Sequence, residues 1–156
     1  MTRALAVAAK NIKSAARLES MNVKDSQFKD LLTRYKKITV VGISPNASRA
    51  SHQIAVYMKN HGYDVVGVNP GHESIAGIRV YKSLQDVPAD YRKFVDVFRS
   101  EDAIPGLVDE VLTVGGVEVL WLQLGIMHAV AESKAEANGI RVVSDRCLLI
   151  EHRNYL

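Results

Sequence analysis

Cysteine is nearly absent from this chain of 156 residues, in which Cys147 stands alone. An internal disulfide and a zinc site built from several cysteines are therefore excluded. A reducing compartment, the cytoplasm, is the setting that we expect. No apolar run approaches the ~20 residues that a membrane-spanning helix needs, so we expect a water-soluble protein with no membrane partner.

A continuous basic stripe is also missing, although the formal net charge is +3. Residues 1–37 carry nine Lys or Arg against three acids, whereas residues 38–156 carry eleven against fourteen. Because no basic stripe with interleaved aromatic residues follows, we expect no nucleic-acid partner. We divide the chain into a basic N-terminal arm or helix over residues 1–22, for which a transit peptide is the alternative, and one domain over residues 23–156.

Short apolar strands alternate with helices along this domain. We expect strands at residues 38–43, 63–68, 78–81, 94–98, 117–124 and 141–143, with 78–81 as a short edge strand. Helices are expected at residues 24–34, where Phe28, Leu31 and Leu32 form an apolar stripe, and after the strands that end near residues 43, 98 and 124. This alternation predicts an α/β fold with a three-layer, doubly wound parallel sheet, which is a Rossmann-like domain.

The stretch between Gly42 and Ser51 joins the first strand to the next helix. A glycine turn at a helix N-terminus gathers unpaired backbone N–H groups and the positive end of the helix dipole in one crevice, which favours an anion. The side chains that add hydroxyl groups or positive charge are Ser44, Ser48, Arg49, Ser51 and His52. The alternative is an ordinary turn in which Ser48 or Ser51 only caps the helix.

Two features of the domain argue against NAD as its ligand. The G-x-G-x-x-G fingerprint is absent, because Ser44 follows Gly42 where the second glycine would let the backbone approach a pyrophosphate. The second strand ends in Asn69-Pro70, where an NAD site would place an acid for the ribose hydroxyls. An adenosine with an extra phosphate on its ribose would tolerate this asparagine and would be repelled by a carboxylate.

Five motifs, in the same order and spacing, resemble those of the stand-alone CoA-binding protein family. They are Gly42-x-Ser44-x-x-x-x-Arg49-x-Ser51, Val68-Asn69-Pro70, Asp96-Val-Phe98-Arg99, Trp121-Leu-Gln123-x-Gly125 and Asp145-Arg146-Cys147-x-x-x-Glu151-His152. That family is similar in fold to the N-terminal CoA-binding domain of the succinyl-CoA synthetase α subunit. The resemblance covers roughly residues 30 to 156 of this chain.

The resemblance implies that coenzyme A, or an acyl-CoA, is the ligand. It implies a pyrophosphate on the first loop, adenosine beside the second strand, and pantetheine running past the next two strand ends. The residues implied at these three places are Gly42, Ile43, Ser44, Pro45, Arg49 and Ser51; Val68, Asn69 and Pro70; and Val97, Phe98, Arg99, Gln123, Leu124 and Gly125. Because CoA carries a pyrophosphate and a ribose 3′-phosphate, Arg49 is a natural charged partner and Arg99 a second candidate. For Arg99 the alternative is an ion pair with Glu101 or Asp102.

No set of residues in the sequence has the spacing of a catalytic site or a metal site, so we expect a binding module without catalysis. We expect Trp121 in the core, Gln123 bonded to loop backbone, and the pair Glu151-His152 packing the chain end. Cys147 is either a small buried residue or a thiol that reaches the CoA thiol. The alternative functions are a small oxidoreductase that uses NAD or NADP, and a domain with a vestigial nucleotide site that works through a protein partner or a second copy of itself.

Overall fold

The structure, a computed structural model, describes residues 26–156. Its strands are β1 (Lys37–Val41), β2 (Asp64–Val68), β3 (Ser74–Ile75), β4 (Ile78–Tyr81), β5 (Phe94–Val97), β6 (Val119–Leu122) and β7 (Arg141–Val143). Its helical segments are residues 26–34, α2 (Ala50–Asn60), α3 (Ile104–Val114), α4 (Ala129–Ala137) and α5 (Leu148–Tyr155), with short 3-10 turns η1 (Leu84–Asp86), η2 (Ala89–Tyr91) and η3 (Glu101–Ala103). The arm expected over residues 1–22 lies outside the described residues.

The described strands form one seven-stranded sheet in the order β3-β4-β2-β1-β5-β6-β7. Every neighbouring pair is parallel except β3 and β4. From β1 the chain first builds β2 and β4 on one side and then crosses to build β5, β6 and β7 on the other. The order therefore reverses between β1 and β5, where a doubly wound sheet leaves its ligand crevice. The predicted α/β fold is confirmed.

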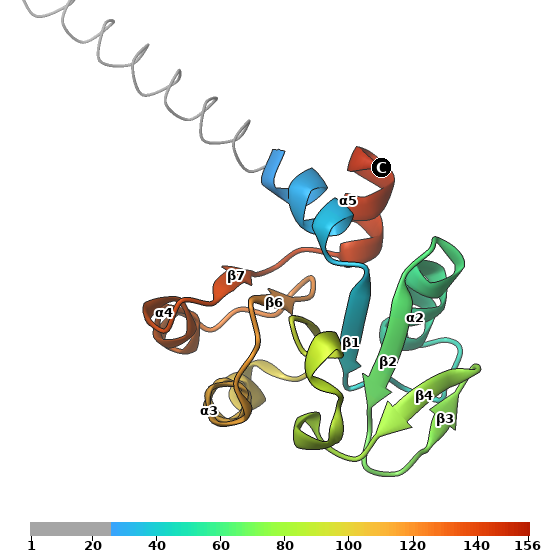
Figure 1. Cartoon of the computed structure of the whole chain (residues 1–156), viewed down its shortest axis with the longest axis horizontal. Helices are drawn as coiled ribbons and strands as arrows, with labels where there is room; N and C mark the ends of the chain where they lie inside the picture. Colours follow the sequence, from blue (N-terminus) through green and yellow to red (C-terminus); the bar gives the residue numbers. More distant parts are fainter. Residues whose placement is uncertain (1–25) are drawn as a thin grey trace, which may run out of the picture.

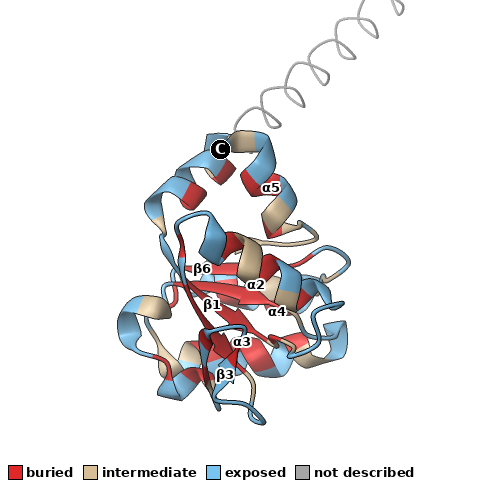
Figure 2. Cartoon of the chain, turned by 90° about the vertical axis from the view of Figure 1, so that its right-hand side faces the viewer, coloured by how far each residue is buried: buried red, intermediate tan, exposed pale blue. Residues whose placement is uncertain are grey.

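Helices cover both faces of this sheet, and two hydrophobic cores result. On one face Leu32, Met58 and Leu148 bring the 26–34 helix, α2 and α5 onto the strands. On the other face α3 and α4 pack through residues that include Val108 and Ala135. Because the central strands are covered on both faces, β5 and β6 are apolar almost throughout and fully buried, as a parallel sheet requires (Figure 2).

The 26–34 helix (blue in Figure 1) lies beside α5 (red), and their aromatic rings join them to the sheet. The ring centroid of Phe28 lies 5.6 Å from that of Trp121 on β6 and 6.0 Å from that of Tyr155 on α5. Trp121 is completely buried, which confirms its predicted place in the core. The amphipathic stripe predicted for this helix is confirmed as well, since Leu31 and Leu32 are buried with Phe28.

The strand at residues 78–81 was predicted to be the edge of the sheet, and this prediction is wrong. The two-residue strand β3 pairs with β4 in an antiparallel hairpin and occupies the edge instead. Ala76 and Gly77 connect the two strands, and both have positive φ angles, as a type I′ turn requires. Alanine rarely adopts such an angle, so the sequence carried no clear signal for this turn.

Candidate functional site

Gly42 closes β1 at the point where the strand order reverses, and its conformation leaves no room for a side chain. Its φ angle is +89°, and a Cβ atom built on it would lie 2.2 Å from the carbonyl oxygen of Phe98. The amide of Gly42 donates to the carbonyl of Val68, while the amide of Phe98 donates to that of Val41. The carboxyl ends of β1, β2 and β5 are therefore drawn together around this glycine.

The N-terminus of α2 opens beside Gly42 without a side-chain cap. Arg49 is the N-cap residue, it has an extended backbone, and its side chain makes no capping hydrogen bond. The first hydrogen bond of the helix runs from the amide of Gln53 to the carbonyl of Arg49, which leaves the amides of the first turn outside the helical ladder. No acidic residue lies in that turn. The predicted anion-binding geometry is thus present in the backbone.

The serines of this loop bond to the loop itself. The hydroxyl of Ser51 accepts the amide of Ser44 at 3.0 Å, and the hydroxyl of Ser44 accepts the amide of Asn46 at 3.1 Å. The hydroxyl of Ser48 donates to the side-chain oxygen of Asn46 at 2.7 Å. Neither Ser48 nor Ser51 caps the helix, so that alternative is wrong. The serines fix the shape of the loop, and Ser51 is buried in doing so.

Asn69 connects this loop to the turn after β2. Its amide nitrogen donates to the carbonyl of Ile43, and its side-chain oxygen accepts the amide of Gly71, both at 2.9 Å. His52 adds a similar contact, because its Nδ1 lies 2.9 Å from the carbonyl oxygen of Ser44. Asn69 and His52, which we expected near the ligand, thus also connect the loops that form the walls of the crevice.

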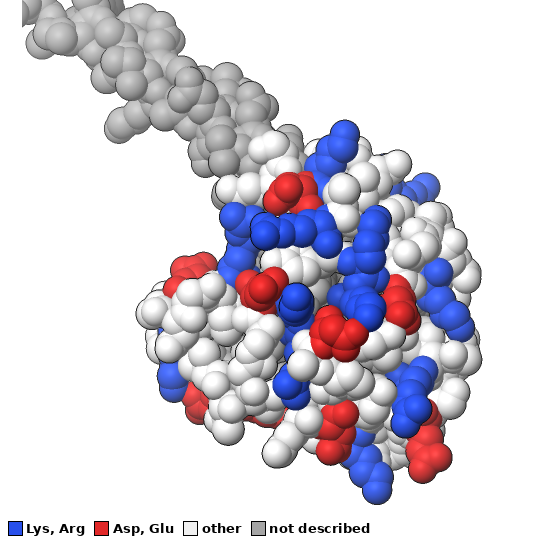
Figure 3. Space-filling view, in the orientation of Figure 1, with Lys and Arg blue, Asp and Glu red and all other residues white. Residues whose placement is uncertain are grey.

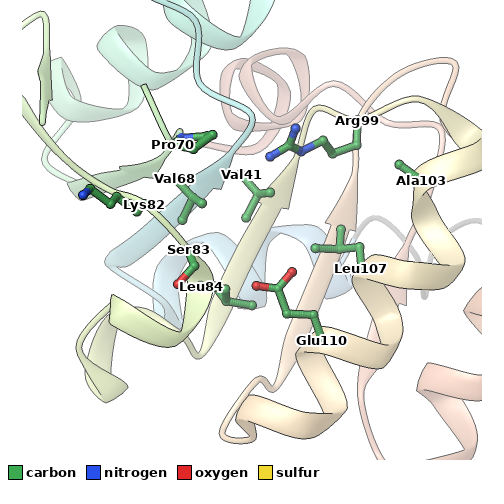
Figure 4. Close-up of a pocket in the computed structure, with 10 residues that line it drawn as sticks. All are labelled: Val41, Val68, Pro70, Lys82, Ser83, Leu84, Arg99, Ala103, Leu107 and Glu110. Carbon is green, nitrogen blue, oxygen red and sulfur yellow. The ribbon is translucent and has the colours of Figure 1, made fainter. Parts of the chain in front are cut away.

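A cavity of about 320 Å³ opens from the ends of β1, β2 and β4 toward α3 (Figure 4). Its floor is apolar and includes Val41, Val68 and Leu107, and Pro70 lies at its rim. Its charged residues are Lys82, Arg99 and Glu110. In Figure 4 the guanidinium of Arg99 extends over the strand ends toward Pro70. An apolar slot with cations at its mouth suits a heteroaromatic ring that carries phosphate.

The sequence did not predict Lys82, Leu84 or Glu110 at this place. Lys82 follows β4 directly, and because β4 is parallel to β2, Lys82 comes to the same edge of the sheet as Asn69. Glu110 comes from the middle of α3, and only the packing of that helix brings it to the cavity. No local pattern marks it.

Arg49 and Arg99 are exposed, and among residues 26–156 neither forms an ion pair. The alternative pairing of Arg99 with Glu101 or Asp102 is therefore wrong. On the face shown in Figure 3, lysines and arginines are interspersed with acids. Two of the ion pairs on the surface are Lys37 with Asp90 and Lys134 with Asp109.

Beneath the ends of β5 and β6 lies a buried pair of polar side chains. Gln123 donates from Nε2 to Oδ1 of Asp96 at 2.7 Å, and its Oε1 accepts the amide of Leu148 at 3.4 Å. The second contact confirms that Gln123 bonds to backbone. Asp96 is completely buried, and its Oδ2 has no partner among the described residues. Burial raises the pKa of Asp96 to about 7, although the hydrogen bonds from Gln123 and from the Val97 amide oppose the rise.

The remaining predicted residues come at or after the carboxyl ends of β1, β5 and β6. Val97 is buried, Phe98 is half-buried, and Leu124 and Pro45 are exposed. Gly125 has a φ angle of +82°, and its amide donates to Oδ1 of Asp145 at 2.8 Å, which fastens the loop after β6 to the end of β7.

The chain end packs as the sequence predicted. Glu151 and His152 are both buried in α5, and Nδ1 of His152 lies 2.9 Å from the hydroxyl of Tyr57 on α2. Cys147 is the N-cap residue of α5, and it is half-buried against the core on that face. Its reactivity with the CoA thiol stays a prediction.

Among the residues that the structure describes, no group of three His, Cys, Asp or Glu side chains could hold a metal ion. Within the same residues, no helix is both long enough and apolar enough to cross a membrane.

The sheet order and the crevice define a Rossmann-like α/β domain. A family model described as "CoA binding domain" matches residues 36–153, and the chain belongs to this family. It is 32% identical over 133 residues to the uncharacterized protein YneT of Bacillus subtilis (strain 168), an alignment that covers 84% of this chain and 96% of YneT.

Solved structures have the same fold. A protein from Thermus thermophilus is 34% identical with a TM-score of 0.77, and the match covers 85% of this chain and 98% of that one. The dinucleotide forming acetyl-coenzyme A synthetase 1 of Ca. Korarchaeum cryptofilum is 22% identical with a TM-score of 0.60. The match covers 70% of this chain and 26% of the synthetase, and it extends the likeness in fold to a domain of a larger enzyme.

Proposed function

We propose that this protein binds coenzyme A or an acyl-CoA in the crevice at the carboxyl ends of its strands, without catalysis of its own. The observation that carries the proposal is the uncapped N-terminus of α2, which opens beside Gly42 and next to an apolar cavity with cations at its mouth. The membership of this protein in the CoA binding domain family supports the same ligand.

Each part of CoA has a counterpart in this crevice. The amides at the start of α2 and the side chain of Arg49 would receive the pyrophosphate. The adenine would enter the cavity over Val68, where Lys82 and Arg99 supply positive charge for the 3′-phosphate. Pantetheine would then run past Phe98 toward Gly125.

The end of β2 favours this ligand over NAD. Both polar atoms of the Asn69 side chain are already bonded, to the carbonyl of Ile43 and the amide of Gly71. The position therefore offers no carboxylate to a ribose diol, which is the contact that selects NAD. A ribose phosphate meets no negative charge from this residue.

Thermal unfolding with CoA, dephospho-CoA, acetyl-CoA, NAD and NADP tests the proposal. We expect the melting temperature to rise with CoA and acetyl-CoA, and to rise less with dephospho-CoA, which lacks the 3′-phosphate. A response to NAD or NADP alone would support the oxidoreductase instead. If no compound shifts the melting temperature, the domain with a vestigial site becomes the better description. Incubation with acetyl-CoA should release no free thiol, and steady release would contradict the absence of catalysis.

Replacing Arg49 tests the pyrophosphate site directly. Arg49→Ala should weaken CoA binding by about 1.5–3 kcal/mol, the value of a hydrogen bond to a charged group. Its unfolding should be unchanged, because the side chain is exposed and makes no cap. The control is Arg153→Ala, which removes an exposed arginine from the last turn of α5 and should leave the dissociation constant as it is. Equal affinities of Arg49→Ala and wild type would remove Arg49 from the site.

A further inference from the structure

Glu110 is an acid in a cavity whose proposed ligand carries phosphate, and the proposed function does not use it. The residue lies in α3 and lines the cavity beside β4 together with Arg99. In Figure 4 its carboxylate points into the cavity, between Leu84 and Leu107. An acid that faced a phosphate group would weaken binding. The part of the ligand that Glu110 meets therefore has to be something other than a phosphate.

The carboxylate of Glu110 is free to bind a ligand. Among the described residues its side chain forms no ion pair and no hydrogen bond, so neither Lys82 nor Arg99 neutralises it. Arg92 lines an adjoining cavity of about 430 Å³ that shares Glu110, but its guanidinium donates to the carbonyl of Gln85 at 3.4 Å. The oxygen atoms of Glu110 are thus open to an N–H group of a ligand.

The polar groups on the two sides of the cavity differ in kind. On one side, next to Pro70, the guanidinium of Arg99 can only donate hydrogen bonds (Figure 4). On the other side are Ser83 and Glu110. The hydroxyl of Ser83 donates its proton to Oδ2 of Asp86 at 3.0 Å, so toward the cavity it can only accept. A carboxylate also only accepts. One side of the cavity therefore donates and the other accepts.

Adenosine 3′-phosphate carries groups that match these two sides. Its phosphate oxygens accept hydrogen bonds and suit Arg99. Its base presents ring nitrogens that accept and one exocyclic amino group that donates. Only that amino group can bond to a wall of acceptors. The apolar side chains of Val68 and Leu107 line the same cavity and can cover the ring.

On the basis of the proposed function, we propose that Glu110 recognises the adenine of CoA by accepting a hydrogen bond from its 6-amino group. The bond orients the ring in the cavity, with the ribose phosphate toward Arg99 and away from the acid. Because guanine also carries N–H donors, the decisive test removes the donor from adenine and does not exchange the base.

A binding cycle that changes both the ligand and the protein tests the inference. The ligands are CoA and 1,N6-etheno-CoA, in which a two-carbon bridge replaces both protons of the amino group. Calorimetric titration gives the dissociation constants. We expect wild type to bind CoA at least about tenfold more tightly than etheno-CoA, the ratio for losing a hydrogen bond to a charged group.

Glu110→Gln should reduce this ratio to less than about threefold, because an amide can accept from the amino group or donate to the etheno ring. The side chain keeps its size, so a ratio that came from the bulk of the bridge would persist. The loss of one negative charge affects both ligands alike and cancels in the ratio. The control Glu136→Gln removes an exposed acid of α4 that lies outside the cavity, and it should keep the ratio of wild type.

The outcomes separate the two proposals. Equal affinities of wild type for the two ligands, or the same ratio in wild type and Glu110→Gln, would overturn the role of Glu110 and leave CoA binding intact. An equal loss of the ratio in Glu136→Gln would also overturn it. If wild type binds neither CoA nor etheno-CoA, the proposed function fails and the role of Glu110 fails with it.

Discussion

Asp96→Asn should change how the stability of this protein depends on pH. Asp96 lies in the middle of β5 with no solvent exposure, and one of its oxygen atoms has no hydrogen-bond partner among the described residues. An asparagine keeps the oxygen that accepts from Gln123 and cannot ionise. The substitution therefore isolates the free energy of ionising this carboxyl group from its packing.

The magnitude follows from the shift in the pKa. Burial raises the pKa of Asp96 from 3.8 to about 7, so the folded state holds the proton more tightly than the unfolded state. The resulting stabilisation is fully present below pH 3.8 and is lost as the pH rises through 7. Between pH 5 and pH 8 wild type should thus lose about 2–3 kcal/mol relative to Asp96→Asn. The NH₂ group of the asparagine lacks an acceptor, and the stability that Asp96→Asn loses for this reason is the same at every pH.

Urea unfolding of both proteins at pH 5, 6, 7 and 8 provides the measurement. Trp121 is the single tryptophan of the chain and is completely buried, so its fluorescence reports the transition. The control is Asp109→Asn, since that carboxylate lies on the surface of α3 with a side chain that is 62% exposed. The reasoning is refuted if the stabilities of wild type and Asp96→Asn run parallel from pH 5 to pH 8.

Two further predictions concern stability. Gly42→Ala should destabilise the protein by at least about 2 kcal/mol more than Gly62→Ala in urea unfolding. Both glycines have a φ angle near +90°, but a Cβ atom would meet backbone at Gly42, whereas the space around Gly62 is open. Similar losses of stability in the two variants would show that the contact with Phe98 relaxes easily. Burial lowers the pKa of His152 below its usual 6.5, so the neutral ring stabilises the fold above pH 6.5 and this contribution is lost as the pH falls. His152→Gln should therefore lose less stability than wild type between pH 6.5 and 5, and equal losses would contradict the assignment.

Much of the candidate site could be predicted because its residues follow strands directly. The β-branched run before Gly42 predicts β1, and the glycine predicts the turn that α2 follows. Once the sheet is known to be parallel, residues such as Asn69 and Gln123 must gather at one edge. The strand ends were placed to within a few residues, because each strand is bounded by glycine, proline or polar residues.

The roles of individual side chains were harder to predict from the sequence. Ser51 is predicted to donate to a ligand, and the structure shows that its hydroxyl accepts the amide of Ser44, so the donation to a ligand stays a prediction. A serine can satisfy a loop amide or a phosphate equally well, so its residue type does not decide between them. Gln123 and Asp96 are 27 residues apart, and they meet only because β5 and β6 are neighbours in the sheet.

The sequence by itself determined the alternation of strands and helices and the glycine turn between β1 and α2, because each of these depends on residues close together in the chain. The tertiary structure decided the rest: the hairpin at the sheet edge, the cavity that includes Glu110, and the unpaired carboxyl oxygen of Asp96. These features arise where segments distant in sequence are packed together by the crossovers of the sheet. No local pattern of residues records that packing.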